Sequence, residues 1–184
     1  HEGAYSAFAI EISGLLNYGQ ENEILVKGDN SSRPDVLPFN HTLFGVYGGI
    51  YRPVSLIITN NVNISVTDYA SPGVYISQKE VSSKTARISI KVKMENKHRM
   101  GQSIQLVNTI YDADNIIKQQ KESTVKILPS GRQSFEQEFI LNKPHLWQGL
   151  ENPYLYKVVT QLKSNNIVID EVVQPLGIRK FELI

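Results

Sequence analysis

The stretch "ARISIKVKME" (residues 86–95) alternates apolar and polar side chains with a period of two. Its apolar residues would share one face of an extended chain: Ile88, Ile90, Val92 and Met94. The positions between them carry Arg87, Ser89, Lys91 and Lys93. Alternation of this kind predicts an antiparallel strand with one face buried and the other in water.

The same period continues along the chain in "SIQLVNTIYD" (103–112), "IIKQQKESTVKIL" (116–128) and "QSFEQEFIL" (133–141), where the polar Gln137 sits on the face of Phe135 and Phe139. Turn residues separate these strands: "DADN" (112–115), Pro129-Ser130-Gly131 and Asn165-Asn166. The last pair lies between "YLYKVVTQL" and "IVIDEVVQ", which predicts a closing hairpin. Turn signals about every ten residues from 62 to 184 are typical of a β-sandwich.

The first sixty residues have a different sequence pattern, with shorter expected strands and a long polar loop. Residues 5–12 and 22–28 are expected to be short strands, and "SGLLNYG" (13–19) has room for one helical turn only. A long polar loop, residues 29–45, is followed by a Gly-Gly kink that leads into an apolar strand within 50–59. Loops of that length are usually functional or disordered. We expect a boundary near Asn60-Asn61.

Composition narrows the class of protein. Hydrophobic residues make up 41% of the 184 residues, enough for a buried core. Nineteen basic and eighteen acidic residues give a net charge of +1, without the basic patch that nucleic acid requires. No apolar run approaches the length of a membrane span, and cysteine is absent. The start at His1, without signal peptide, suggests an excerpt from a longer protein, whose localisation signals would lie outside it.

Candidate chemistry is sparse. The four histidines (His1, His41, His98 and His145) lack metal-ligand spacing, and Asp112 and Asp114 lack the glycine and terminal glutamate of a calcium loop. No nucleophile elbow, phosphate-binding loop or dinucleotide fingerprint occurs. We therefore expect no metal, no cofactor and no catalytic residue in this chain.

The stretch "PHLWQGLENPYLYKVV" (144–159) contains the only tryptophan, Trp147. An exposed indole could serve as a sugar platform. Pro144 and Pro153 bracket the stretch, and Tyr154 and Tyr156 share a face. A corner that passes from one sheet to the other, clamped by the indole, is the favoured interpretation.

Four segments together resemble glycoside hydrolase family 2, the β-galactosidase and β-glucuronidase group, and within it the β-galactosidases of gut Bacteroidetes. They are "HEGAYSAFAIEIS" (1–13), "GGIYRPVSLI" (48–57), "LWQGLENPYLYKV" (146–158) and "VIDEVVQPLGIRKFEL" (168–183). Their order matches the order in the family, and together they span nearly the whole chain.

The resemblance implies an all-β fold: residues 1–60 as the C-terminal part of a jelly-roll sugar-binding domain, and residues 62–184 as an immunoglobulin-like antiparallel β-sandwich. The family's catalytic barrel, with its glutamates, would follow Ile184, so this chain alone should not hydrolyse a glycoside. The parent protein would hydrolyse terminal β-linked sugars, with a periplasmic or extracellular location favoured.

The resemblance also suggests site residues. Asp29 or Asn30 would reach sugar hydroxyls from the loop 28–47, although an Asx-turn at Asp29 is equally compatible with "KGDN". Arg52 and Arg179 would hold domain interfaces. The expected partners are carbohydrate in the full-length context and the protein's own catalytic barrel, with neither nucleic acid nor membrane.

Two other functions stay open, a stand-alone carbohydrate-binding module and an immunoglobulin-like adhesion or assembly module. A partial jelly roll would also leave an apolar face uncovered around Phe8, Ile10 and residues 54–58. We expect such a face to recruit a second copy of the chain, giving a homodimer.

Overall fold

The protein is described by a computed structural model that covers residues 1, 6–31, 34–35 and 48–181. The chain divides into two compact units, His1–Ile58 and Thr59–Ile184. This division falls close to the predicted boundary. The assignment of the two units to a jelly-roll domain and an immunoglobulin-like domain stays a prediction.

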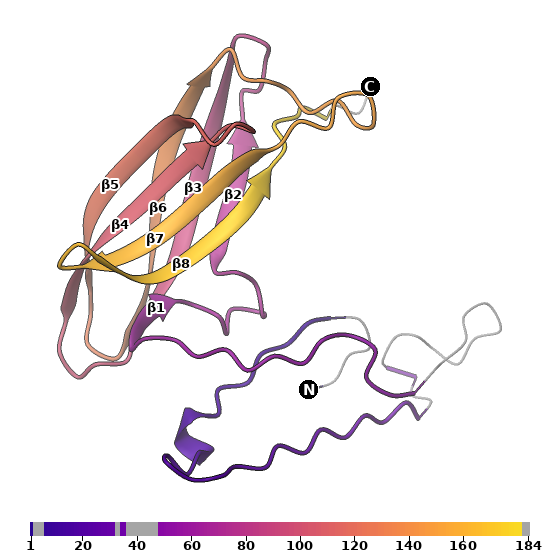
Figure 1. Ribbon diagram of the computed structural model, residues 1–184, viewed down its shortest axis with the longest axis vertical. Coiled ribbons are helices and arrows are strands. Elements are labelled where there is room, and N and C mark those ends of the chain that lie inside the picture. Colours follow the sequence, from indigo (N-terminus) through magenta and orange to yellow (C-terminus); the bar gives the residue numbers. More distant parts are fainter. Residues whose placement is uncertain (2–5, 32–33, 36–47, 182–184) are drawn as a thin grey trace. The chain divides into compact units, whose positions relative to one another are not determined.

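The second unit is a sandwich of two antiparallel sheets (Figure 1). In the first sheet β3 is central, with β6 on one side and β2 and β1 on the other. The second sheet has the order β5-β4-β7-β8. The strands are β1 Val62–Ile64, β2 Val74–Lys79, β3 Thr85–Asn96, β4 Gln102–Tyr111, β5 Ile117–Ile127, β6 Gly131–Asn142, β7 Tyr156–Ser164 and β8 Ile167–Leu176. The predicted all-β fold with antiparallel sheets is confirmed.

Strand β3 shows why alternation predicts the fold. The four apolar residues predicted to share a face are fully buried, and they pack in one core with residues from both sheets such as Phe139 and Leu106. On the opposite face, Arg87 forms ion pairs with Glu80 at 3.3 Å and Glu138 at 3.4 Å. One face of β3 therefore supplies the hydrophobic core, while the other carries charged pairs of the kind that suit a solvated sheet.

A chain of polar side chains crosses the core. Asn108 on β4 donates to Gln137 on β6 (3.0 Å) and accepts from Thr160 on β7 (2.5 Å). Gln137 in turn donates to Ser123 on β5 (2.9 Å). Asn108 and Thr160 are completely buried, so the hydrogen bonds offset the cost of removing these groups from water. Because β6 belongs to the other sheet, these contacts, which we call the core polar chain, join the two sheets.

The predicted turns are present. In the β4–β5 turn, Oδ1 of Asp112 accepts hydrogen bonds from the backbone N–H groups of Asp114 (3.0 Å) and Ile116 (2.9 Å). Asn165 and Asn166, between β7 and β8, have φ angles of 49° and 64°. Asparagine tolerates this left-handed region better than most residues, which explains its use here.

Residues 143–155 connect β6 in one sheet to β7 in the other, so the predicted corner is confirmed. The indole of Trp147 is partly exposed and packs against the segment after β8 rather than deep in the core. Its backbone N–H donates to Ile178 (2.8 Å), and the guanidinium of Arg179 lies 4.9 Å from its ring centre. A Cβ on Gly177 would lie 3.3 Å from the indole Cγ, so this close approach favours glycine.

In the described part of the first unit, a short 3-10 helix, Ser13–Leu15, lies at the position where a single turn was expected. The strands predicted at 5–12, 22–28 and within 50–59 are wrong: in the described residues of these ranges the backbone forms no β-ladder. Their apolar side chains are exposed, including Phe8, Ile10 and Leu56. Alternation indicates a tendency to be buried on one side, but a strand also needs a neighbour for its backbone groups.

Candidate functional site

Asp29, the first predicted sugar contact, begins a local turn. Its Oδ1 accepts hydrogen bonds from the backbone N–H (2.9 Å) and the hydroxyl (2.6 Å) of Ser31. These two bonds lower the pKa of the Asp29 carboxyl, which is exposed and remains ionised at neutral pH. The Asx-turn considered for this position is therefore present. Whether the carboxylate also meets a sugar stays a prediction.

Asn30, the second predicted contact, lies against the Gly-Gly kink. A Cβ at Gly48 would stand 3.2 Å from Nδ2 of Asn30, so the absence of a side chain at residue 48 lets the amide approach the backbone. Gly49 has a φ of +102°, which also favours glycine. Much of the loop 28–47 that was expected to shape the pocket, residues 32–33 and 36–47, lies outside the described residues.

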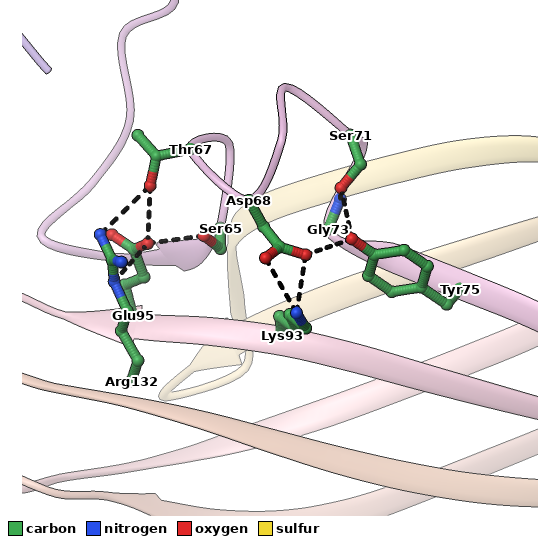
Figure 2. A network of polar contacts seen from close by, with 9 residues as sticks. All are labelled: Ser65, Thr67, Asp68, Ser71, Gly73, Tyr75, Lys93, Glu95 and Arg132. Carbon is green, nitrogen blue, oxygen red and sulfur yellow. Dashed lines mark hydrogen bonds and ion pairs between the residues drawn. The ribbon is translucent and has the colours of Figure 1, made fainter. Parts of the chain in front are cut away.

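A second polar cluster, which sequence reasoning missed, lies on the outer face of the first sheet (Figure 2). It surrounds the loop from Ser65 to Gly73 that joins β1 to β2. At one end, the carboxylate of Glu95 accepts hydrogen bonds from Ser65 (2.6 Å) and Thr67 (3.1 Å) and pairs with Arg132 (3.0 Å). The Glu95 side chain is 9% exposed, and these three donors compensate its burial.

At the other end of the loop, both carboxylate oxygens of Asp68 lie 2.8 Å from Nζ of Lys93. Tyr75 donates its hydroxyl hydrogen to Asp68 and also contacts the Ser71 hydroxyl at 2.8 Å. The hydrogen bonds from Lys93 and Tyr75 lower the pKa of Asp68, and the bond to Asp68 raises the pKa of Lys93. Each partner favours the charged form of the other, so the pair stays ionised across the neutral range.

Gly73 closes this loop in a left-handed conformation, with φ of +72°. A Cβ there would lie 2.5 Å from the carbonyl oxygen of Ser65 and 2.7 Å from Cγ2 of Ile64. Its own carbonyl accepts a hydrogen bond from the backbone N–H of Lys93 (2.8 Å). The loop is thus held by backbone contacts as well as by Glu95 and Asp68. "SPG" at 71–73 signals a turn, but the partners on β3 and β6 are too distant in sequence to be foreseen.

The corner between β6 and β7 contains His145, one of the four histidines. His145 stacks on Tyr154, with ring centres 3.9 Å apart, and contacts Asn152 at 2.8 Å. Within the part of the chain that the structure describes, no group of three or more His, Cys, Asp or Glu side chains is arranged to hold a metal ion. None of the helices found there is long and apolar enough to cross a membrane.

Comparison with known proteins gives consistent matches. The family model "Glycosyl hydrolases family 2" matches residues 71–179. A β-glucuronidase of Bacteroides fragilis is 40% identical over 98% of this chain and 26% of its own length. A β-galactosidase of Bacteroides ovatus, BoGH2A, is 24% identical over 97% of this chain and 20% of its own.

The fold matches solved structures as well. A Bacteroides fragilis protein whose crystal structure is described as that of a "putative beta-galactosidase" is 54% identical. It superposes with a TM-score of 0.97 over 100% of this chain and 27% of its own. A β-glucuronidase of Bacteroides uniformis gives 0.75 at 28% identity, over 84% of this chain and 18% of its own.

The chain thus spans about a quarter of the length of the Bacteroides fragilis proteins that it matches. The family model covers more than half of the chain, and the residues that it matches include strands β2 to β8. The chain belongs to glycosyl hydrolase family 2.

Proposed function

We propose that this chain is a non-catalytic portion of a family 2 glycosidase, which positions a catalytic domain and contributes to the rim of its sugar pocket. The observation that carries the proposal is the match over the whole chain but only about a quarter of two relatives. The resemblance assigns catalysis to a barrel beyond Ile184. Catalytic action then belongs to the longer protein.

Asp29 and Asn30 are the residues that we propose for contact with sugar. Both contacts of Asp29 fall on Oδ1, and among the described residues Oδ2 has no hydrogen-bond donor. An ionised carboxylate fixed by a turn is a good acceptor for sugar hydroxyls, since charged hydrogen bonds are about twice as strong as neutral ones. The Asx-turn then serves to orient the carboxylate.

For the longer protein we propose hydrolysis of a terminal β-linked sugar, with β-galactoside as the first choice. The matching proteins carry names of both β-galactosidases and β-glucuronidases, which supports the β-linkage more than the sugar. Turnover of paired chromogenic β-galactosides and β-glucuronides by the longer protein would separate the two. Faster turnover of the glucuronide would contradict the galactoside proposal.

The 184-residue chain itself is expected to turn over neither chromogenic substrate, because it carries no catalytic carboxylate pair under this proposal. The same preparation is titrated with galactose and glucuronate while amide NMR shifts are recorded. Saturable shifts at residues 28–31 that disappear in Asp29→Ala would support the sugar contact. Turnover that scales with enzyme concentration and survives repurification would overturn the proposed function.

We also propose that the first unit pairs with a second copy of the chain when it is not covered by other parts of the protein. Ile10 is 66% exposed, Val54 67% and Ile58 88%. Extended apolar segments without ladder partners are templates for strand pairing. Light scattering after size exclusion is expected to show a mass that rises with concentration, and a constant monomer mass would contradict this association.

A further inference from the structure

Tyr69 is the most unusual residue of the β1–β2 loop. Its side chain is 90% exposed, and its φ of 53° lies in the left-handed region. The next residue, Ala70, has a φ of 52°. Residues other than glycine, asparagine and aspartate rarely adopt this backbone conformation, and a bulky residue there is a genuine outlier. Two such residues in succession show that the loop holds its shape against local preference.

The loop is able to hold this shape because it is fixed on both sides of Tyr69. Asp68, immediately before, is bound to Lys93 and Tyr75. Ser71, two residues after, contacts the Tyr75 hydroxyl at 2.8 Å and accepts a hydrogen bond from Gly73 N–H at 3.3 Å. Figure 2 shows these side chains gathered around the loop above β3. The ring of Tyr69 is therefore presented to solvent by a rigid support.

The fold itself does not use the Tyr69 ring, since nearly all of it is in water. Unfavourable backbone conformations persist where surrounding structure enforces them, and they gather at ligand sites. Here the enforcing contacts are the Asp68–Lys93 pair and the packing of Gly73. An exposed aromatic ring on a backbone that is fixed in this manner has the properties of a recognition residue, because little backbone entropy is lost when a ligand binds it.

The polar groups of the loop that carries Tyr69 indicate the chemical class of the ligand. Hydroxyls of Thr67 and Ser71, the Lys93 ammonium and the Arg132 guanidinium belong to the same cluster. A protein interface would place apolar neighbours around a central tyrosine. An exposed aromatic ring on a loop that also carries hydroxyl and charged groups suits a sugar, whose C–H face packs on the ring while its hydroxyls exchange hydrogen bonds.

We propose that Tyr69 is the stacking residue of a saccharide site on the loop from Ser65 to Gly73. This site lies in the sandwich unit, whereas Asp29 and Asn30 lie in the first unit. The choice of a saccharide as its ligand rests on the proposed function, but its residues differ from those proposed for the pocket rim. Its ligand is a β-linked oligosaccharide.

The test is an NMR titration of the 184-residue chain with β-linked galactobiose and galactotriose. We expect saturable shifts at residues 65–75, and about tenfold weaker binding in Tyr69→Ala, as the upper range of aromatic stacking energies implies. Tyr18→Ala is the matched control, because Tyr18 is also a tyrosine of high exposure (75%) but lies in the other unit. Its removal should leave binding at 65–75 unchanged.

Tyr69→Gly separates recognition from a structural role. Glycine adopts positive φ without strain, so this variant is expected to keep or raise the melting temperature while losing saccharide binding. A lower melting temperature with binding retained would overturn the inference. So would the absence of shifts at 65–75 at millimolar saccharide, or self-association that depends on Tyr69 without such shifts.

The outcomes also distinguish this inference from the proposed function. Shifts confined to residues 28–31 would overturn the site at Tyr69 and leave the pocket-rim proposal standing. Turnover of a chromogenic substrate by this chain would overturn the proposed function, while shifts at 65–75 that vanish in Tyr69→Ala would still support the saccharide site.

Discussion

Replacing Asn108 by leucine is expected to lower the free energy of unfolding by about 2 to 6 kcal/mol, since two buried partners lose a hydrogen bond at roughly 1 to 3 kcal/mol each. Asn108 donates to Gln137 and accepts from Thr160, and both partners are buried. Leucine has a shape similar to that of asparagine, but its side chain can neither donate nor accept a hydrogen bond. Urea denaturation followed by circular dichroism measures the loss.

Two variants make this result specific. Asn142→Leu changes an exposed asparagine in strand β6 and is expected to shift stability by no more than about 0.5 kcal/mol. The triple variant Asn108→Leu, Gln137→Met, Thr160→Val removes every buried member of the core polar chain, which can be nearly neutral. If the triple variant is less stable than Asn108→Leu alone, unpaired groups are not the cause.

Gly73→Ala is expected to destabilise the sandwich by about 3 kcal/mol or more, through overpacking together with an unfavourable left-handed backbone. The new Cβ would meet the Ser65 carbonyl at 2.5 Å, and backbone atoms cannot turn aside as the end of a side chain can. Relief would require β1 or the loop to move. Such movement would disturb the Ser65 contact with Glu95 as well.

Gly149→Ala is the control for the backbone contribution. Gly149 has a φ of +63°, but a Cβ there would meet no atom within 4 Å. Its cost should therefore be only the conformational one, about 1 to 2 kcal/mol. Equal losses in the two variants, measured by thermal unfolding, would show that the close contact at Gly73 contributes nothing.

The sandwich could be predicted from sequence because its information is local. Alternation in residues 86–95 specifies which face of β3 is buried, and asparagines or glycines at the turns supply positive φ. Both signals are read within a few residues. The corner at Trp147 was foreseen in the same manner, although the indole packs on Gly177 and Arg179 instead of the core.

Gln137 shows what local sequence patterns cannot predict. It is a polar residue on the apolar face of "QSFEQEFIL", and a pattern alone would treat it as a defect. Its partners, Asn108 and Ser123, lie 29 and 14 residues away. Pairing at that distance depends on strand order and register, which single-sequence patterns do not contain. The same limit hid Glu95 and Arg132 beside the loop at 65–73.

The strand predictions for the first unit were wrong for a different reason. Residues 5–12 and 22–28 have the composition of strands, but a strand is defined by hydrogen bonds to a neighbour, and composition does not supply one. At Asp29 the local alternative could be foreseen, because aspartate commonly accepts hydrogen bonds from its own backbone two residues on. The left-handed φ of Tyr69 had no sequence signal at all.

The segment after β8 has a mechanical consequence. Gly177 accepts a hydrogen bond from Gln78 (2.9 Å), Arg179 donates to Gln78 (3.1 Å), and Ile178 accepts from Trp147 (2.8 Å). Tension on the chain beyond Arg179 would load these three bonds together before it reached the β7–β8 ladder. The load would be shared between β2 of the first sheet and the β6–β7 connection, so β8 is protected from peeling away one hydrogen bond at a time.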